Sequence, residues 1–462
     1  MDVGERCALR RQSFLLLLAL AWTSGIISGC AALPRQPAVP QALTTRAVTP
    51  GVPESRYWPD IDPRPMLRDS LLSVDRELSA AYQDVNEGGR LPPINLLALS
   101  GGGDAGAFGA GLLVGWSAEG SRPEFNIVTG ISAGALIAPF AFLGSKYDSV
   151  LESVCGTIGP GDIFHIHNVL AALSGDGMAD DRPLEALIAK YVTSQTLSDI
   201  AHEYAKGRQL LIGTTDLDAR QRVIWNMGAI ASSSDPRALI LFRQIILAST
   251  AIPGIFPPVM IDVEVDGRRY QEMHVDGGVM NTAFLLPPLY VSGIPGMLVR
   301  DRRDRRVYVI RNGYLTGKWV AVSRRTTTVA RRALDSLIEA QGMNDLYRLE
   351  VAAREDHEEF HLAFIGAEFE YPHKREFDAE YIRHLFRYSF RLAARGYSWH
   401  GELPGMTQSP MAKLIATDTA TVPPTGSSLG YPSADQACEQ CPEASTSRRP
   451  DVIKVQPVPG SY

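Results

Sequence analysis

The pentapeptide Gly130-Ile131-Ser132-Ala133-Gly134 constrains the fold more than any other stretch of the sequence. It follows the apolar, strand-like segment 125–129 and precedes the apolar run 135–138. Glycines on both sides of a serine permit a very tight strand-to-helix turn, which exposes the serine hydroxyl at the edge of a sheet. A hydroxyl held in this way can act as a nucleophile. Ser132 is therefore the candidate catalytic residue.

The same G-x-S-x-G pattern occurs a second time, at Gly426-Ser427-Ser428-Leu429-Gly430. This copy lies in a segment rich in Pro, Ser and Thr, with no apolar strand before it and no helix-like run after it, so its context excludes it. For the first copy, an ordinary Gly/Ser turn between a strand and a buried helix remains the alternative.

Short apolar strands alternate with helix-like stretches between Ile94 and about Asn312. The predicted strands are 94–98, 127–128, 210–213, 223–225 and 307–310, and the predicted helices are 107–116, 182–191 and 236–247. This alternation predicts an α/β protein with a layered sheet. A long basic helix from 322 to about 354, a strand at 361–364 and a helix at 379–395 predict a C-terminal extension, residues 313–400, packed on the same core.

The N-terminus has the pattern of an export signal covering residues 1–29. Basic residues precede the apolar run 14–22, which is far shorter than the roughly 20 residues that span a bilayer. The ending Ile27-Ser28-Gly29-Cys30 resembles the lipobox of bacterial lipoproteins, which implies a lipid anchor on Cys30. By the same resemblance, Ala31 favours the outer membrane of a Gram-negative cell. A plain signal-peptidase site and an incidental Cys30 remain the alternatives.

Composition predicts the character of the segments outside the core. Residues 30–60 are rich in proline, which predicts an extended tether, and residues 401–462 are rich in Pro, Ser and Thr, which predicts disorder. The net charge of −6 argues against nucleic acid as a partner. Cys155 is expected in the core, and Cys438 and Cys441 favour a local disulfide over a zinc site.

The first strand of the predicted sheet runs directly into the glycine loop Gly101-Gly102-Gly103-Asp104-Ala105-Gly106. Consecutive glycines before a helix expose backbone N–H groups to an anion. The loop also fits G-x-G-x-x-G, so a dinucleotide site competes with an oxyanion site. The second strand leads to Ser132 instead of an acidic ribose ligand, and this favours an oxyanion.

Asp276-Gly277-Gly278 follows His274-Val275 at the end of a short strand. An Asp-Gly turn is the simplest interpretation. A serine nucleophile needs a base, however, and an aspartate with an ordinary pKa of ~4 must act by direct contact with the hydroxyl and by shielding from water.

The three motifs occur in this order, and together they resemble the patatin-like phospholipase family. Two further segments, Thr215-Asp216-Leu217-Asp218 and residues 248–258, also look like that family. The resemblance covers residues 90–312 and implies a three-layer α/β/α sandwich that hydrolyses membrane lipids or other acyl esters without a metal or cofactor. The resemblance also implies the roles of individual residues: Ser132 as nucleophile, Asp276 as its only base, and an oxyanion hole from Gly101, Gly102 and Gly103. The other motif glycines would be Gly106, Gly130, Gly134, Gly277 and Gly278. The family often has Arg or Lys where this chain has Ala105, which affects headgroup contacts and leaves the backbone donors intact.

Two other functional hypotheses compete with that of a serine hydrolase. His357-Glu358-Glu359-Phe360-His361 matches the zinc signature H-E-x-x-H, with Glu380 as a third ligand, although the apolar residues after it favour a strand. A non-catalytic lipoprotein that binds lipids or partner proteins is the other alternative. Arginines within 300–306 and 324–332 could face anionic headgroups or simply be solvated. The sequence does not predict an oligomeric state.

Overall fold

The computed structural model describes residues 33–81, 92–166, 176–285, 303–317 and 319–404. The chain divides into two units, Met1–Met406 and Thr407–Tyr462, and every described residue belongs to the first. The predicted signal, Cys30, Cys438, Cys441 and most of the predicted tail therefore lie outside the described residues. None of the helices in the described ranges combines the length and apolar character needed to cross a bilayer.

A mixed sheet runs through the described unit in the strand order β1-β7-β6-β3-β2-β10-β11. Its strands are β1 (Arg56–Tyr57), β2 (Ile94–Leu99), β3 (Ile127–Gly130), β6 (Gln209–Asp216), β7 (Gln221–Asn226), β10 (Arg305–Ile310) and β11 (Glu359–Ala363). The strands from β6 to β11 along this order are parallel to one another, whereas β7 is antiparallel to β6. A hairpin of β8 (Val259–Val265) and β9 (Arg268–Asp276) joins the sheet through the end of β6.

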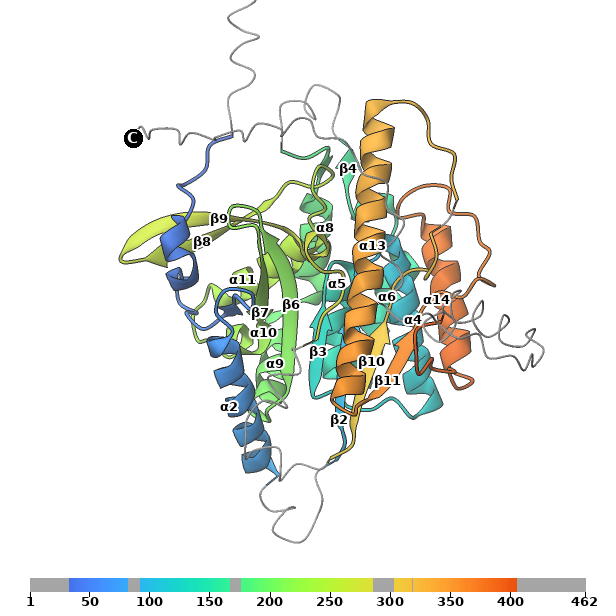
Figure 1. The fold of residues 1–462 in the computed structure, drawn as a ribbon, viewed down its shortest axis with the longest axis horizontal. Helices are drawn as coiled ribbons and strands as arrows, with labels where there is room; N and C mark the ends of the chain where they lie inside the picture. The colour runs from blue at the N-terminus through green and yellow to red at the C-terminus, as the bar shows by residue number, and fades with distance from the viewer. Residues whose placement is uncertain (1–32, 82–91, 167–175, 286–302, 318, 405–462) are drawn as a thin grey trace, which may run out of the picture. The chain divides into compact units, whose positions relative to one another are not determined.

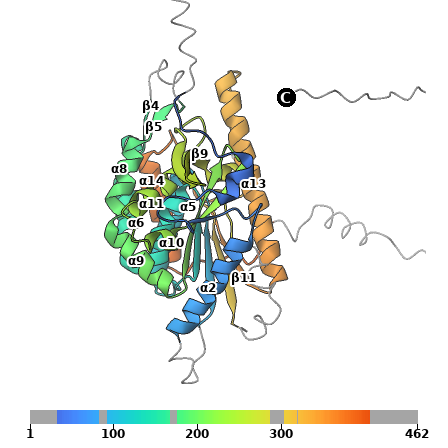
Figure 2. The same ribbon diagram turned by 90° about the vertical axis from the view of Figure 1, so that its left-hand side faces the viewer.

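Alternating side chains of the central strands face two different helical layers. Leu97 and Leu99 of β2 point into a large core with the helices of one face, whereas Leu96 and Ala98 pack with Leu346 of the other face. The first layer contains α4, α5, α6, α9, α11 and α14, and the second contains α2 and α13 (Figures 1 and 2). The predicted three-layer α/β/α sandwich is therefore confirmed.

The helices have the following bounds: α2 (Arg64–Ala80), α4 (Gly106–Glu119), α5 (Ala133–Leu143), α6 (Asp148–Thr157), α8 (Arg182–Tyr191), α9 (Ser194–Ala205), α10 (Met227–Ala231), α11 (Ala238–Thr250), α13 (Thr326–Glu355) and α14 (Ala379–Ala393). Short elements complete the described chain: η1 (Gln41–Arg46), η2 (Gly103–Ala105), η3 (Ser145–Tyr147), η4 (Pro160–Asp162), η5 (Gly277–Val279), β4 (His165–Ile166) and β5 (Ala179–Asp180).

The prediction of an extended tether over 30–60 is wrong for the residues that the structure describes. Arg56 is buried and forms an ion pair with the equally buried Glu272, and it also donates to the Ala47 carbonyl at 2.8 Å. Trp58 is buried in the main core, and β1 pairs with β7. Proline requires only an extended backbone, so its frequency did not reveal that the side chains between the prolines enter the core.

Residues 313–400 pack on the same core and also complete its sheet. β11 pairs in parallel with β10 and forms the edge of the sheet next to it. α14 lies against α4 at glycines: a Cβ atom on Gly111 would come within 2.3 Å of the Phe386 carbonyl oxygen. This segment is therefore part of the folded layer structure.

Candidate active site

Ser132 lies on a strained turn between β3 and α5. Its backbone has φ 54° and ψ −124°, in a region that a residue with a side chain rarely adopts. The flanking positions must be glycine, because a side chain at either one would collide with the backbone. A Cβ atom on Gly130 would lie 2.5 Å from the Gly134 carbonyl oxygen, and one on Gly134 would lie 2.2 Å from that of Leu99. The sequence therefore folds into the sharp serine turn that the pentapeptide predicts.

Asp276 ends β9, and an interaction of its carboxyl group with the Ser132 hydroxyl favours the charged form. The same carboxyl accepts the Gly278 N–H at 2.7 Å. Burial raises the pKa of Asp276 to about 6, although both interactions favour the charged form. The two residues predicted to form a dyad thus interact with each other and are largely shielded from water, each 5% exposed.

Glycine at position 277 is also fixed by its surroundings. A Cβ atom there would lie 2.6 Å from the Gly213 carbonyl oxygen on β6, so the backbone after Asp276 can turn only because this residue has no side chain. Gly278 supplies the N–H that binds the Asp276 carboxylate. Both motif glycines therefore hold the carboxyl group in place.

The glycine loop offers two backbone donors beside Ser132, not the three that the sequence predicts. The Gly101 N–H donates to the Thr282 carbonyl at 3.0 Å, so it is not available to an oxyanion. The N–H groups of Gly102 and Gly103 have no acceptor among the described residues. Gly101 has a different role, because a Cβ atom there would lie 3.1 Å from that of Ser132. The loop can approach the serine only without that side chain.

Asn312 fixes the glycine loop, although it belongs to none of the three sequence motifs. Its side-chain amide donates to the Ser100 carbonyl at 2.7 Å and accepts the Gly109 N–H at 3.0 Å. Its own N–H donates to the Ser100 hydroxyl at 2.8 Å. Asn312 follows β10, at the same edge of the sheet as the loop. A polar residue just after a predicted strand is the signal that could have revealed it.

Ser249, in α11, supports the serine turn from beneath. The Ser132 N–H donates to the Ser249 hydroxyl at 3.0 Å, and that hydroxyl donates to the Gly213 carbonyl at 2.7 Å. In the sequence, the segment 248–258 is distinguished only by its resemblance to the patatin-like family. In the structure, its Ser249 contacts the backbone of the candidate nucleophile.

The first turn after the glycine loop is tied to the C-terminal extension. The Asp104 carboxylate accepts the Phe377 N–H at 2.9 Å and lies 2.6 Å from Nε2 of His373. This hydrogen bond raises the pKa of His373. Ala105, the position where the family often has a basic residue, precedes α4 and contributes only a small side chain. Gly106, which begins α4, allows close packing, since a Cβ atom there would lie 2.9 Å from that of Ala133.

An apolar cavity of about 100 Å³ opens beside the glycine loop and Ala133, the residue after Ser132. Its walls come from α4, α5, α6, α8 and the start of α14. The lining side chains are almost all apolar and include Ala107, Leu136, Ile137, Phe140, Leu151, Ile188, Phe377 and Ile382. Cys155 also lines it, and burial raises the pKa of this thiol to about 12, which agrees with the predicted core role. The cavity is suited to a hydrocarbon chain.

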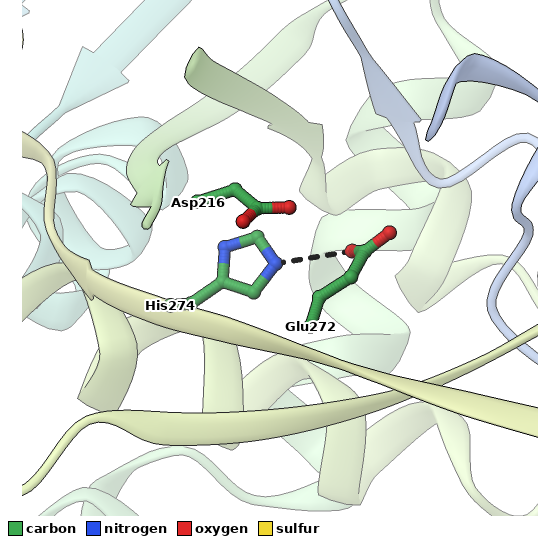
Figure 3. Close-up of side chains that lie close together, drawn as sticks. All are labelled: Asp216, Glu272 and His274. Atoms are coloured by element: carbon green, nitrogen blue, oxygen red, sulfur yellow. Dashed lines mark hydrogen bonds and ion pairs between the residues drawn. The ribbon is translucent and has the colours of Figure 1, made fainter. Parts of the chain in front are cut away.

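A buried polar cluster of Asp216, Glu272 and His274 lies where β6 pairs with β9 (Figure 3). Their potential ligand atoms lie within 4.8 Å of one another, which is close enough for a metal ion. Glu272, however, already accepts hydrogen bonds on both oxygens from Arg56. Burial alone would raise the pKa of Glu272, but Arg56 and His274 outweigh it and lower that pKa to about 2. The donor set fits a buried ion-pair network better than a metal site.

His274 is not placed to replace Asp276 as the base. Its Nδ1 lies 3.0 Å from the Thr214 hydroxyl and its Nε2 lies 3.2 Å from Glu272. Both ring nitrogens are therefore engaged in the cluster.

The H-E-x-x-H segment does not form the geometry of a zinc protease. His357 lies in the turn after α13 with φ 56°, and His361 lies on β11, stacked on Tyr308 at 4.7 Å. The zinc motif needs both histidines on one helix face. The segment instead leads from the end of α13 into β11, which agrees with the strand that the apolar residues favour.

Residues 97–289 match the family model described as patatin-like phospholipase. These residues form a patatin-like phospholipase domain. The domain contains the glycine loop, Ser132 and Asp276, whereas Asn312 and α14 lie beyond it. The family match supports lipid hydrolase activity for this domain. No curated protein sequence matches the chain.

Distant likenesses to this chain occur among solved structures. VipD from Legionella pneumophila is 16% identical over 66% of this chain and 67% of its own, with a TM-score of 0.31. The type III effector protein ExoU is 14% identical over 71% of this chain and 59% of its own, with a TM-score of 0.24. ExoU in complex with SpcU, from Pseudomonas aeruginosa, gives 14% identity, 72% and 60% coverage and a TM-score of 0.23. TM-scores of this size carry no argument, so the assignment rests on the family match.

Proposed function

We propose that the chain is a serine acyl hydrolase that cleaves carboxylic esters of lipids through an acyl-enzyme on Ser132. The observation that carries this proposal is the interaction of the Ser132 hydroxyl, on its strained turn, with the buried Asp276 carboxyl. A nucleophile in contact with a base, on a strained turn beside free backbone donors, is the arrangement that acyl transfer requires.

In the first half of the reaction, Ser132 Oγ attacks the ester carbonyl carbon and its proton passes to Asp276. The negative charge that develops on the carbonyl oxygen is stabilised by the N–H groups of Gly102 and Gly103, and the N-terminus of α5 faces the same site. Asp276 then returns the proton to the leaving alcohol oxygen as the ester C–O bond breaks. The acyl group remains on Ser132.

In the second half, Asp276 takes a proton from water, and the resulting hydroxyl oxygen attacks the acyl-enzyme. The Ser132 oxygen leaves with that proton, and a free carboxylic acid is released. A base whose pKa lies near 6 is better matched to neutral pH than an ordinary aspartate, which has a pKa near ~4. Burial thus compensates for the absence of a histidine from this step.

The apolar cavity supports a long hydrocarbon chain as the acyl part of the substrate. Its walls begin next to Gly103 and Ala133, so an acyl chain in the cavity would place its carbonyl near Ser132. Attachment of the exported chain to the outer membrane through a lipidated Cys30 belongs to the same proposal. It is supported by the lipobox-like ending and would keep the domain near lipid substrates.

A panel of phospholipids, lysophospholipids and p-nitrophenyl esters of increasing chain length tests this function. Wild type should hydrolyse acyl esters, with a preference for chains long enough to fill the cavity, and Ser132→Ala should not. A folded wild-type protein that binds these lipids without hydrolysing any of them would support a non-catalytic lipid-binding lipoprotein instead.

A further inference from the structure

The first half of α13 extends past the sheet that the second half covers. α13 connects β10 to β11, which are parallel, so it begins at the carboxyl ends of these strands and runs back along the sheet. Its buried residues begin only at Gly342. The first sixteen residues, 326–341, include none that is buried, which corresponds to about 24 Å of helix at 1.5 Å per residue. This overhang lies beyond the catalytic edge of the sheet (Figure 1).

Large apolar side chains are exposed along the overhang and in the residues just before it. Trp319 is 88% exposed, Val320 57%, Val329 51% and Leu337 69%. An exposed tryptophan beside exposed valines is unusual on a surface that contacts only water. Tryptophan is enriched at the interface between a bilayer and water, where its ring sits at headgroup level.

The same segment is strongly basic. Residues 319–334 contain four arginines and no acidic residue. Arg331 pairs with Glu376, whereas Arg324 and Arg325 are exposed in the turn before α13. Basic side chains next to exposed Trp and Val match the chemistry of a membrane with anionic headgroups, to which each arginine adds attraction near the surface.

The position of this basic, apolar segment also agrees with binding to a membrane. In both views the start of α13 and the first described residues of the chain, in blue, lie at the same end of the described unit (Figures 1 and 2). Leu33, at the start of that segment, lies three positions after Cys30 and is itself 50% exposed. A bilayer at this end would face both the catalytic edge and the predicted anchor.

We propose that Trp319, Val320, Arg324, Arg325 and the exposed face of 326–337 form a docking surface for an anionic lipid bilayer. The surface holds the carboxyl edge of the sheet, and with it Ser132, toward the lipid. This proposal rests on the proposed function in taking a membrane lipid as the substrate. It assigns the recognition of the membrane to residues outside the patatin-like domain.

Flotation of the full chain with vesicles tests the docking surface. Cys30→Ser is used throughout so that a lipid anchor does not contribute, and vesicles contain phosphatidylcholine alone or with one quarter phosphatidylglycerol. The variants are Trp319→Ser/Val320→Ser and Arg324→Glu/Arg325→Glu. The controls are Leu72→Ser/Ile240→Ser, which removes comparably exposed apolar side chains elsewhere, and Arg387→Glu/Arg391→Glu, which makes the same charge change on α14.

Each docking variant should weaken association with the anionic vesicles at least tenfold, and the controls should bind like the Cys30→Ser parent. The parent should lose most of its binding in 1 M salt, where charge attraction is screened within about 3 Å. Parent-like binding by both docking variants would overturn the proposal. So would self-association of the parent that Trp319→Ser/Val320→Ser abolishes without any vesicle binding, because the surface would then join copies of the chain.

Hydrolysis of soluble p-nitrophenyl butyrate separates this proposal from the proposed function. The docking variants should retain that activity within twofold while losing activity on anionic vesicles. If the parent hydrolyses no ester but binds vesicles through this surface, the proposed function fails and docking stands. If ester hydrolysis depends on Ser132 but vesicle binding ignores the docking variants, the function stands and docking fails.

Discussion

The Ser132 hydroxyl interacts with the Asp276 carboxyl beside the end of β6 and favours its charged form. β3, which leads to Ser132, pairs with the first residues of β6, and β9, which ends at Asp276, pairs with its last residues on the same side, because β7 occupies the other side. Neither residue reaches the other through local sequence. The pairing of three strands brings them together, so the proposed chemistry depends on the assembled sheet.

The first prediction concerns pH. Because burial raises the pKa of Asp276 to about 6, kcat/KM for an ester should rise as pH increases through about 6 and level off above it. The folded protein binds this proton more tightly than the unfolded chain does, so the carboxylate makes folding less favourable as pH rises from about 4 to 6. Asp276→Asn should therefore be inactive yet more stable than wild type at pH 8, by about 1 to 3 kcal/mol. Urea unfolding and pH–rate profiles measure both effects, and a rate that does not change between pH 5 and 7 would contradict the role of Asp276.

The second prediction concerns Ser249. Ser249→Ala removes the acceptor of the buried Ser132 N–H, which costs about 1 to 3 kcal/mol and lets the serine turn relax. We expect at least a tenfold loss of kcat in a folded protein. Ser389→Ala is the matched control, because Ser389 is also fully buried but bonds only carbonyls of its own helix. Equal kcat values in the two variants would show that the Ser249 contact does not position the nucleophile.

The third prediction concerns Asn312. Asn312→Asp keeps the shape of the side chain but replaces the amide donor to the Ser100 carbonyl with an oxygen. The glycine loop should shift, and loss of oxyanion donors typically lowers kcat by about 10² to 10³. Asn95→Asp provides a comparison at the opposite end of β2, where a buried amide also donates to a backbone carbonyl. Steady-state kinetics should show a large loss of kcat for the first variant and almost none for the second.

The fourth prediction concerns the buried cluster of Asp216, Glu272 and His274. Arg56→Met leaves Glu272 buried without its guanidinium partner and should destabilise the fold by about 3 to 5 kcal/mol. Adding Glu272→Gln should recover much of that loss, because the uncompensated charge is then removed. Exhaustive chelation should change neither stability nor ester hydrolysis, since Arg56 occupies both Glu272 oxygens. Loss of activity on chelation with recovery on adding zinc would instead identify the cluster as a metal site.

The order of layers and the sharp serine turn could be predicted because they depend on local constraints. The serine turn needs glycine on both sides, and the alternation of apolar strands with helices defines an α/β sandwich. The bounds of α8 were predicted to the residue, since its apolar positions recur at helical spacing. β11 and α14 were likewise predicted within about two residues at each end.

The remaining features depend on distant contacts that a single sequence does not specify. In the sequence, Gly101 cannot be distinguished from Gly102, because both are glycines of the same loop. Only the folded structure shows that the Gly101 N–H donates to the Thr282 carbonyl and so is not available to an oxyanion. The role of Arg56 follows from a partner, Glu272, on a hairpin most of which was not predicted. Asn312 and Ser249 act through backbone groups of other elements, so neither belongs to a recognisable motif.

Turnover of one activated ester by Ser132→Ala, Asp276→Asn and the double variant tests the central claim most directly. A nucleophile and its base act as a unit, so each single variant should lose nearly all turnover and the double variant should be little slower than either. Circular dichroism on the same samples establishes that they are folded. Near wild-type turnover in either folded single variant, or a double variant whose loss is the product of the two single losses, would contradict the dyad.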